Sequence, residues 1–183
     1  MAKRQEDRRP RQAAAPLERL RVFGDPVLKQ PTRLVTTFDD RLRKLSEVMF
    51  EVMEREEGVG LAAPQIGVVS RVMVWKDPDD GDRPYVYVNP HIVEASETVT
   101  VEPEGCLSVP GETMEVPRAD EVLVEAQDLQ GSPFQARHCG YQARVVQHEI
   151  DHLDGCLIID RTSQEERRRV LKDLRERALS VGR

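Results

Sequence analysis

The sequence predicts an α+β fold, in which a central helix with two histidines packs against antiparallel or mixed β-sheets and a C-terminal helix follows. Apolar residues recur at helical spacing in 39–58 and again in 140–155. Short apolar segments lie between these stretches, separated by turn-forming clusters such as 77–81, which is typical of strands. The charged segment at the end of the chain carries a thin apolar stripe, which predicts a helix on the surface.

The first helix and the strands can be placed approximately. The helix begins at Asp39-Asp40, whose carboxylates can cap its first backbone N–H groups, and it ends at Gly58. Its apolar residues recur every three or four positions and are expected to face the core: Leu42, Leu45, Met49, Val52 and Met53. Four strands are predicted after it, at 72–75, 85–88, 92–101 and 122–126.

The second helix, from Gly140 to Asp154-Gly155, contains the run His148-Glu149-Ile150-Asp151-His152. On a helix with about 3.6 residues per turn, His148 and His152 lie on one face, so both can bind one cation. A divalent cation lowers the pKa of bound water towards neutrality, and the carboxylate of Glu149 could take and return the proton. The alternative is a partly exposed helix whose histidine and glutamate side chains are merely solvated.

Two upstream segments bear on this choice. The run Glu104-Gly105-Cys106-Leu107-Ser108 offers a thiolate, which is a strong ligand for a borderline metal, in a context that suits a bent loop. The second segment, Gly58-Val59-Gly60-Leu61-Ala62-Ala63-Pro64-Gln65, is rich in glycine and alanine. With these two segments and the histidine motif in this order, the chain resembles the peptide deformylases from Leu20 to the C-terminal helix.

This resemblance implies a set of metal ligands. Cys106, His148 and His152 match the three ligands of the family, which leaves a fourth coordination position open for catalysis. The resemblance implies Fe²⁺ as the natural metal, with Zn²⁺, Ni²⁺ or Co²⁺ as replacements. The sequence itself does not rank the affinities of these ions for the site. A thiolate bound to ferrous iron is prone to oxidation, so aerobic purification is expected to give weakly active or zinc-loaded protein.

The resemblance also implies catalytic groups. Glu149 matches the general base and acid of the family. The side-chain amide of Gln65 and the backbone N–H of Leu107 match the two donors to the oxygen that becomes negative when the formyl carbonyl is attacked. The implied function is metal-dependent hydrolysis of the N-formyl group from the initiator methionine of nascent polypeptides, with release of formate.

The implied substrate site is an apolar pocket for an unbranched methionine side chain, beside a strand edge that can pair with peptide backbone. Val59 and Val145 match the pocket wall, and Gly60 matches the position that pairs with the substrate. Thr113 stands where relatives have an arginine, which leaves the preference beyond methionine open.

Composition supports one catalytic domain over 17–183, preceded by a disordered basic tail over 1–16. The chain has 183 residues, of which 39% are hydrophobic and 33% charged, and no apolar run is long enough to span a bilayer. Three cysteines, one of them assigned to the metal, indicate a reducing compartment, so we expect a cytoplasmic protein. Neither a membrane nor a specific DNA sequence is expected as a partner.

The predicted C-terminal helix over 161–183 is basic, although the whole chain has a net charge of −6. In relatives of this type, the corresponding helix meets the ribosome near the exit of the nascent chain, and a cationic helix would suit ribosomal RNA. A solvated surface helix with intrahelical Glu/Arg pairs is the alternative.

Two other functions are compatible with parts of the sequence. The histidine motif alone would fit a zinc endopeptidase, but such enzymes commonly take their third ligand downstream, whereas Cys106 lies upstream. The chain could also be a non-catalytic metal-binding or ribosome-binding module. The presence of Glu149 and Gln65 argues against that alternative, because metal binding alone requires neither side chain.

Overall fold

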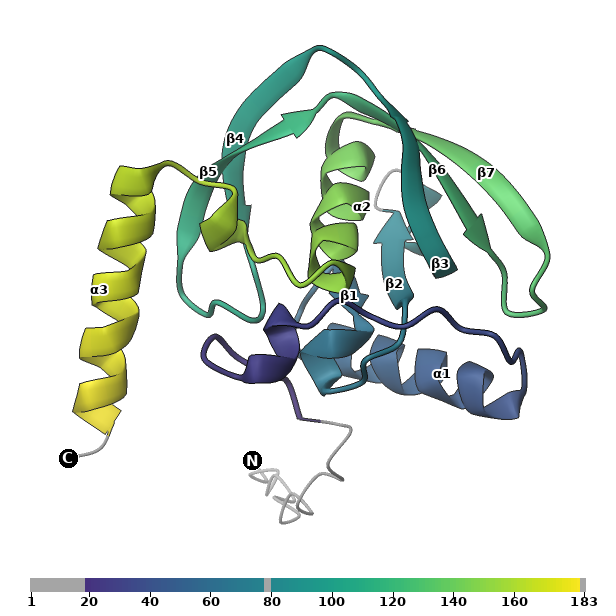
Figure 1. Cartoon of the computed structure of the whole chain (residues 1–183), viewed down its shortest axis with the longest axis horizontal. Coiled ribbons are helices and arrows are strands. Elements are labelled where there is room, and N and C mark those ends of the chain that lie inside the picture. The colour runs from purple at the N-terminus through teal and green to yellow at the C-terminus, as the bar shows by residue number, and fades with distance from the viewer. Residues whose placement is uncertain (1–18, 78–79, 182–183) are drawn as a thin grey trace, which may run out of the picture.

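The computed structural model describes residues 19–77 and 80–181, and the tail predicted over 1–16 lies outside them. Three α-helices and seven β-strands form the body of the described chain (Figure 1). The helices are α1 (Asp40–Arg55), α2 (Gly140–Leu153) and α3 (Gln164–Val181). The strands are β1 (Gly60–Ala62), β2 (Val72–Asp77), β3 (Arg83–Ala95), β4 (Val99–Gly105), β5 (Thr113–Ala119), β6 (Glu121–Gln127) and β7 (Pro133–Cys139). Short 3-10 helices η2 (Pro26–Lys29), η3 (Ala63–Ile66) and η5 (Ile158–Asp160) connect them.

The strands form two antiparallel sheets, which confirms the predicted α+β class. The larger sheet has the order β1-β2-β3-β6-β7, and β4 pairs with β5 in the smaller one. Figure 1 shows α2 between these sheets, α1 near β1 and β2, and α3 outside the smaller sheet. The central helix therefore has a protein environment on most of its sides, and ten of its residues are buried.

Each face of the larger sheet has its own apolar core because successive side chains on a strand point to opposite faces. On one face, Met73 and Trp75 of β2 pack with residues of α2 such as Val146 and Leu153. On the other face, Val72 and Val74 pack with α1. Every apolar residue predicted for the inner face of α1 is buried or half-buried: Leu42, Leu45, Met49, Val52 and Met53.

The structure differs from the predicted elements at several places. β1, β5 and β7 were not predicted, and the segments predicted as separate strands at 85–88 and 92–101 share β3. The strand predicted over 92–101 is divided between β3 and β4, because the hydroxyl of Ser96 donates to the carbonyl of Thr98 and the chain turns there. α1 ends at Arg55, before Gly58. The C-terminal helix begins at Gln164 instead of residue 161, because the hydroxyl of Ser163 accepts a hydrogen bond from the Glu166 N–H and so caps the first turn.

No helix within the described residues is both long enough and apolar enough to cross a membrane.

Protonation of His138 is expected to destabilise the fold at mildly acidic pH. The ring is buried beside Trp75, its Nε2 lies 3.0 Å from the hydroxyl of Tyr87, and burial lowers its pKa although Gln142 and Asp77 act in the opposite direction. A lowered folded-state pKa means that the unfolded chain binds more protons just below pH 6.5, so stability is present above that pH and is lost as the pH falls.

Urea denaturation at a series of pH values between 7 and 5 measures this effect. The free energy of unfolding of the wild type should fall more steeply than that of a His138→Gln variant, in which the titrating ring is absent. Parallel curves for the two proteins would contradict the prediction.

Candidate metal centre

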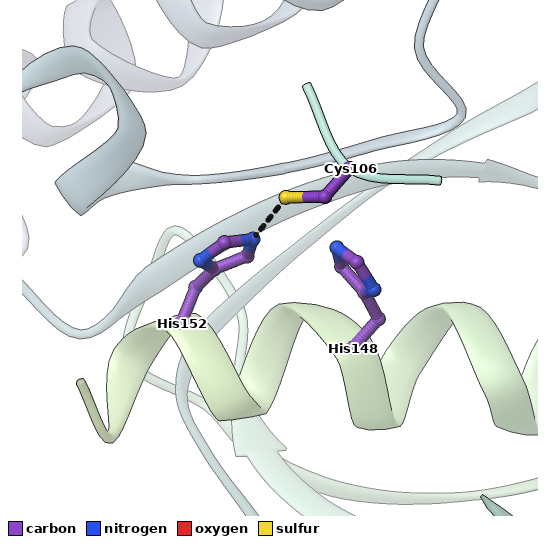
Figure 2. A group of neighbouring side chains, drawn as sticks. All are labelled: Cys106, His148 and His152. Carbon is purple, nitrogen blue, oxygen red and sulfur yellow. Dashed lines mark hydrogen bonds between the residues drawn. The ribbon is translucent and has the colours of Figure 1, made fainter. Parts of the chain in front are cut away.

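Helix α2 places His148 and His152 on one face, as predicted from their spacing. Their ring centroids are 5.0 Å apart, and both rings point to the same side of the helix (Figure 2). His152 is buried and His148 is half-buried. The helix is fixed in the core by its other faces, so the positions of the two imidazoles are determined by packing rather than by solvent-exposed side-chain rotamers.

Cys106 reaches the histidines from the opposite side, on the segment that follows β4. A turn after the strand, closed by the Val109 N–H donating to the Cys106 carbonyl at 2.9 Å, directs the thiol towards α2. The Cys106 Sγ lies 3.2 Å from the His152 Nε2 (Figure 2), and the ligand atoms of Cys106, His148 and His152 are all within 4.8 Å of one another. Three residues from distant parts of the sequence thus converge on one point.

This donor set fits a divalent cation. The His148 Nδ1 lies 3.0 Å from the Glu104 Oε2, which fixes the ring and leaves its Nε2 available as a ligand. The buried His152 Nδ1 has no hydrogen-bond partner among the described residues. Two imidazole nitrogens and one thiolate are suitable ligands for zinc or ferrous iron, and with three protein ligands a coordination position stays open.

Glu104 anchors the site through a buried network of charges. Arg118 forms two parallel hydrogen bonds with it, at 2.9 and 3.0 Å, and Arg144 donates to it at 2.8 Å. Burial opposes ionisation, but the hydrogen bonds from His148 and Arg118 outweigh it and lower the pKa of Glu104 to about 2. A third hydrogen bond of Arg118, to Asp151 at 2.5 Å, connects this carboxylate to α2.

The two imidazoles have opposite pKa shifts. Burial lowers the pKa of His152, and the neighbouring His148 lowers it further. Burial also opposes protonation of His148, but hydrogen bonding with Cys106 and Glu104 raises its pKa above the ordinary value.

Glu149 is the candidate proton carrier and lies directly beside the two histidines on α2. Its side chain is buried, burial raises its pKa to about 7, and its Oε2 has no hydrogen-bond partner among the described residues. A carboxylate with a pKa near neutrality can both accept and donate a proton at physiological pH.

Gly60 leaves the space that Glu149 occupies. A Cβ atom built on Gly60 would lie 2.4 Å from the Glu149 Oε1, which is closer than any non-bonded contact allows. We therefore expect Gly60→Ala to displace the carboxylate and to lower kcat by about tenfold or more, because small displacements of a reacting group are costly. Steady-state kinetics together with metal content measure this effect. An unchanged kcat at full metal occupancy would contradict the prediction.

Gln65 and Leu107 reach the site from elements other than α2: Gln65 lies on η3, and Leu107 directly follows Cys106. On η3, the Gln65 Oε1 accepts a hydrogen bond from the Ala62 N–H at 2.8 Å, and its Nε2 donates to the Ser108 Oγ at 3.2 Å. An amide nitrogen carries two hydrogens, so one donor of Gln65 is left for a ligand. Among the described residues, the backbone N–H of Leu107 has no partner.

Cys106, His148, Glu149, Gln65 and Leu107 border one cleft of about 1390 Å³. Val59 and Val145 line it, with Val59 exposed and Val145 buried. Gly60 lies on β1, the outer strand of the larger sheet. The Lys76 N–H donates to the Val59 carbonyl, and because backbone groups alternate between the two edges of a strand, those of Gly60 point to the unpaired edge. His152 lies behind the cleft rather than in its wall.

Several residues of the site were not singled out from the sequence. Glu104 and Ser108 flank the cysteine in its motif, yet their roles as partners of His148 and Gln65 depend on contacts across more than forty positions of the chain. Arg118 and Asp151 complete the buried network. One sequence feature could have indicated the role of Arg118: within 113–119 it takes a position that alternates with the apolar residues Met114 and Val116, so its charge is expected to be buried and paired.

Comparison with known proteins agrees with the geometry. The model of the polypeptide deformylase family matches residues 17–168. The peptide deformylase of Thermotoga maritima is 44% identical over 165 residues, which cover 90% of this chain and 99% of that protein. The crystal structure of a peptide deformylase from Legionella pneumophila superposes with a TM-score of 0.83 at 39% identity, covering 90% of this chain and 97% of that one. The chain belongs to the peptide deformylase family.

Proposed function

We propose that Cys106, His148 and His152 hold the catalytic metal and that Glu149 carries the proton. The reaction is that of the family: hydrolytic removal of the N-formyl group from the initiator methionine of nascent polypeptides. The observation that supports this assignment best is the convergence of three ligand atoms within 4.8 Å beside the buried carboxylate of Glu149.

The residues of the site account for the chemistry. A divalent cation, when bound, supplies Lewis acidity that makes water a nucleophile near neutral pH. Glu149 accepts a proton from the attacking water and returns it to the amine that leaves, so the products are formate and a free amino terminus. The raised pKa of Glu149 suits both transfers.

Gln65 and Leu107 are proposed as donors to the developing negative charge on the formyl oxygen. The hydrogen bond to Ser108 and the one accepted from the Ala62 N–H fix the amide before substrate arrives. Donors fixed in this way are each worth about 3 to 4 kcal/mol in the transition state.

The peptide is proposed to bind along the unpaired edge of β1. The backbone groups of Gly60 would pair with the substrate in the manner of an added strand. Val59 and Val145 would contact the methionine side chain, because both line the cleft beside the metal ligands.

We propose Fe²⁺ as the native metal, with Zn²⁺, Ni²⁺ or Co²⁺ as functional replacements. The mixed imidazole and thiolate donors support an ion of this class. Anaerobic and aerobic preparations test the choice by their metal content and turnover. Oxygen should lower both, because the Cys106 thiolate and ferrous iron are oxidised together. Equal iron and equal turnover would contradict it.

Residues 17–183 are proposed to act as one domain in the cytoplasm. Val170 of α3 is buried in the same apolar cluster as Cys106, which supports a single unit. The three cysteines are unpaired, as is usual in a reducing compartment.

We propose a ribosome contact through the outer side of α3. Arg168 and Arg175 are exposed there, and the segment 161–183 has a net charge of +4. Replacing both arginines with glutamate should weaken co-sedimentation with ribosomes, with a salt dependence typical of phosphate contacts. Unchanged pelleting would leave α3 a structural helix.

Formate release from N-formyl-Met-Ala-Ser by anaerobically prepared, iron-loaded protein tests the function. Turnover should stop on chelation and return when Fe²⁺ is restored. An endopeptidase would instead cleave internal bonds of an unformylated peptide, so casein fragments serve as the contrasting substrate. Cleavage of casein without formate release would replace the proposal by the protease alternative.

A further inference from the structure

The C-terminal helix α3 packs against the segment that forms one wall of the cleft. Val170 is buried, and Leu171 and Leu174 are half-buried, in an apolar cluster that also contains Cys106, Val109 and Met114. In Figure 1, α3 lies outside β4 and β5. The segment between these strands carries a metal ligand, so α3 supports the site from behind.

Two arginines of α3 bind one buried carboxylate in this segment. Glu112 has a side chain that is only 3% exposed. The Arg177 Nη2 lies 2.5 Å from its Oε1, and the Arg169 Nη1 lies 3.2 Å from its Oε2. We call these three side chains the Glu112 clasp. The two guanidinium groups are about half exposed, at 49% and 52%, so water screens the clasp from one side only.

The same guanidinium groups also hold the backbone on either side of Glu112. The Arg177 Nη1 donates to the Pro110 carbonyl at 2.9 Å, and the Arg169 Nη2 donates to the Thr113 carbonyl at 3.4 Å. Gly111 has a φ of +75°, and a Cβ atom at that position would lie 2.8 Å from the Arg177 Nη1. Arg177 therefore lies directly against the backbone of the turn.

The backbone held in this way is a wall of the substrate cleft. Pro110, Gly111, Glu112 and Thr113 all line the cleft, together with Cys106 and Leu107 of the same segment. Without the arginines, a buried carboxylate would be left unpaired, and such a group moves towards water. That movement would shift the wall.

We propose that Arg169 and Arg177 are positioning residues for the substrate: through the Glu112 clasp they fix the 110–113 wall of the cleft, and so make α3 a part of the peptide-binding site. The proposal rests on the deformylase function given above. The proposal extends that function by assigning a role in peptide binding to α3, a helix that carries no reacting group.

The position of the clasp predicts which kinetic constant changes. His148, His152 and Glu149 are held by α2 and by the Glu104 network, whose hydrogen bonds are made by side chains outside the clasp. Cys106 is held by the turn that its own carbonyl closes with the Val109 N–H. In the proposed complex, the wall at 110–113 contacts the peptide rather than the reacting atoms. Loss of an interaction that binds substrate and transition state equally raises KM and leaves kcat unchanged.

The test compares four iron-loaded variants with the iron-loaded wild type on N-formyl-Met-Ala-Ser amide, a substrate with no charged group. Arg169→Gln/Arg177→Gln and Glu112→Gln should each raise KM by about five- to tenfold, with kcat within about twofold of wild type. The triple variant should resemble Glu112→Gln, because the two sides of one interaction are not additive. Lys172→Gln is the matched control, since Lys172 pairs with Glu176 within the helix, and its KM should stay at the wild-type value.

Two further measurements separate positioning from folding. Thermal denaturation shows whether each variant is folded at the assay temperature, and iron content shows whether the metal site is intact. Folded, iron-replete variants with wild-type KM would overturn the proposal, as would KM effects that add fully in the triple variant. A wild-type protein without turnover would instead refute the proposed function, and the two failures are thus distinguishable.

Discussion

Glu149→Gln is expected to lower kcat by about 10²–10⁴-fold without loss of the metal, because a positioned proton carrier contributes about that factor to hydrolysis. The amide has nearly the same shape as the carboxylate and fits the space beside Gly60. It cannot accept a proton from water, and no other carboxylate with a raised pKa of this kind faces the site among the described residues. Formate release and metal analysis on the same preparation measure the effect.

The matched control is Asp154→Asn, which makes the same change from acid to amide at the exposed C-terminal cap of α2. Its kcat should equal that of the wild type. The assignment of Glu149 fails if Glu149→Gln keeps more than about a tenth of the wild-type kcat at full metal occupancy, because that loss is below what proton transfer contributes.

The sequence was sufficient to predict those elements whose spacing of apolar or ligand residues matches the contacts that they make in the fold. The spacing of His148 and His152 predicts one helical face, and the packing of α2 leaves that face towards Cys106. The apolar positions of α1 repeat at helical spacing and are buried as expected. In both helices, the spacing of residues in the sequence reflects which face of the helix is turned towards the interior, so the pattern and the packing agree.

Strands β1 and β5 were not predicted because their sequences lack a plain alternation of apolar and polar residues. β5 alternates buried and exposed residues, but Arg118 occupies an inward position and Pro117 interrupts the run. β1 has three residues, all buried, so no alternation is visible. The role of Glu104 depends on His148, Arg118 and Arg144, and no spacing in the sequence indicates that these residues meet.

Arg118→Met should reduce the free energy of unfolding by about 3 kcal/mol, the lower end of the range for breaking a buried ion pair. The arginine side chain is 5% exposed and bridges Glu104 to Asp151. Methionine fills much of the volume but leaves both carboxylates short of a partner. The loss stays near the lower end because Arg144 still pairs with Glu104 and Arg161 still pairs with Asp151.

Urea denaturation of the metal-free proteins measures this loss separately from any effect of the ion on stability. Arg137→Met is the control: Arg137 also bridges two carboxylates, Glu94 and Glu121, but on the exposed surface, so its removal should change stability little. The metal should also bind more weakly to Arg118→Met, by about 10- to 100-fold, because Glu104 would orient His148 less firmly. Equal losses of stability in the two variants would mean that burial does not strengthen the Arg118 network. Unchanged metal affinity would mean that Arg118 does not help Glu104 to orient His148.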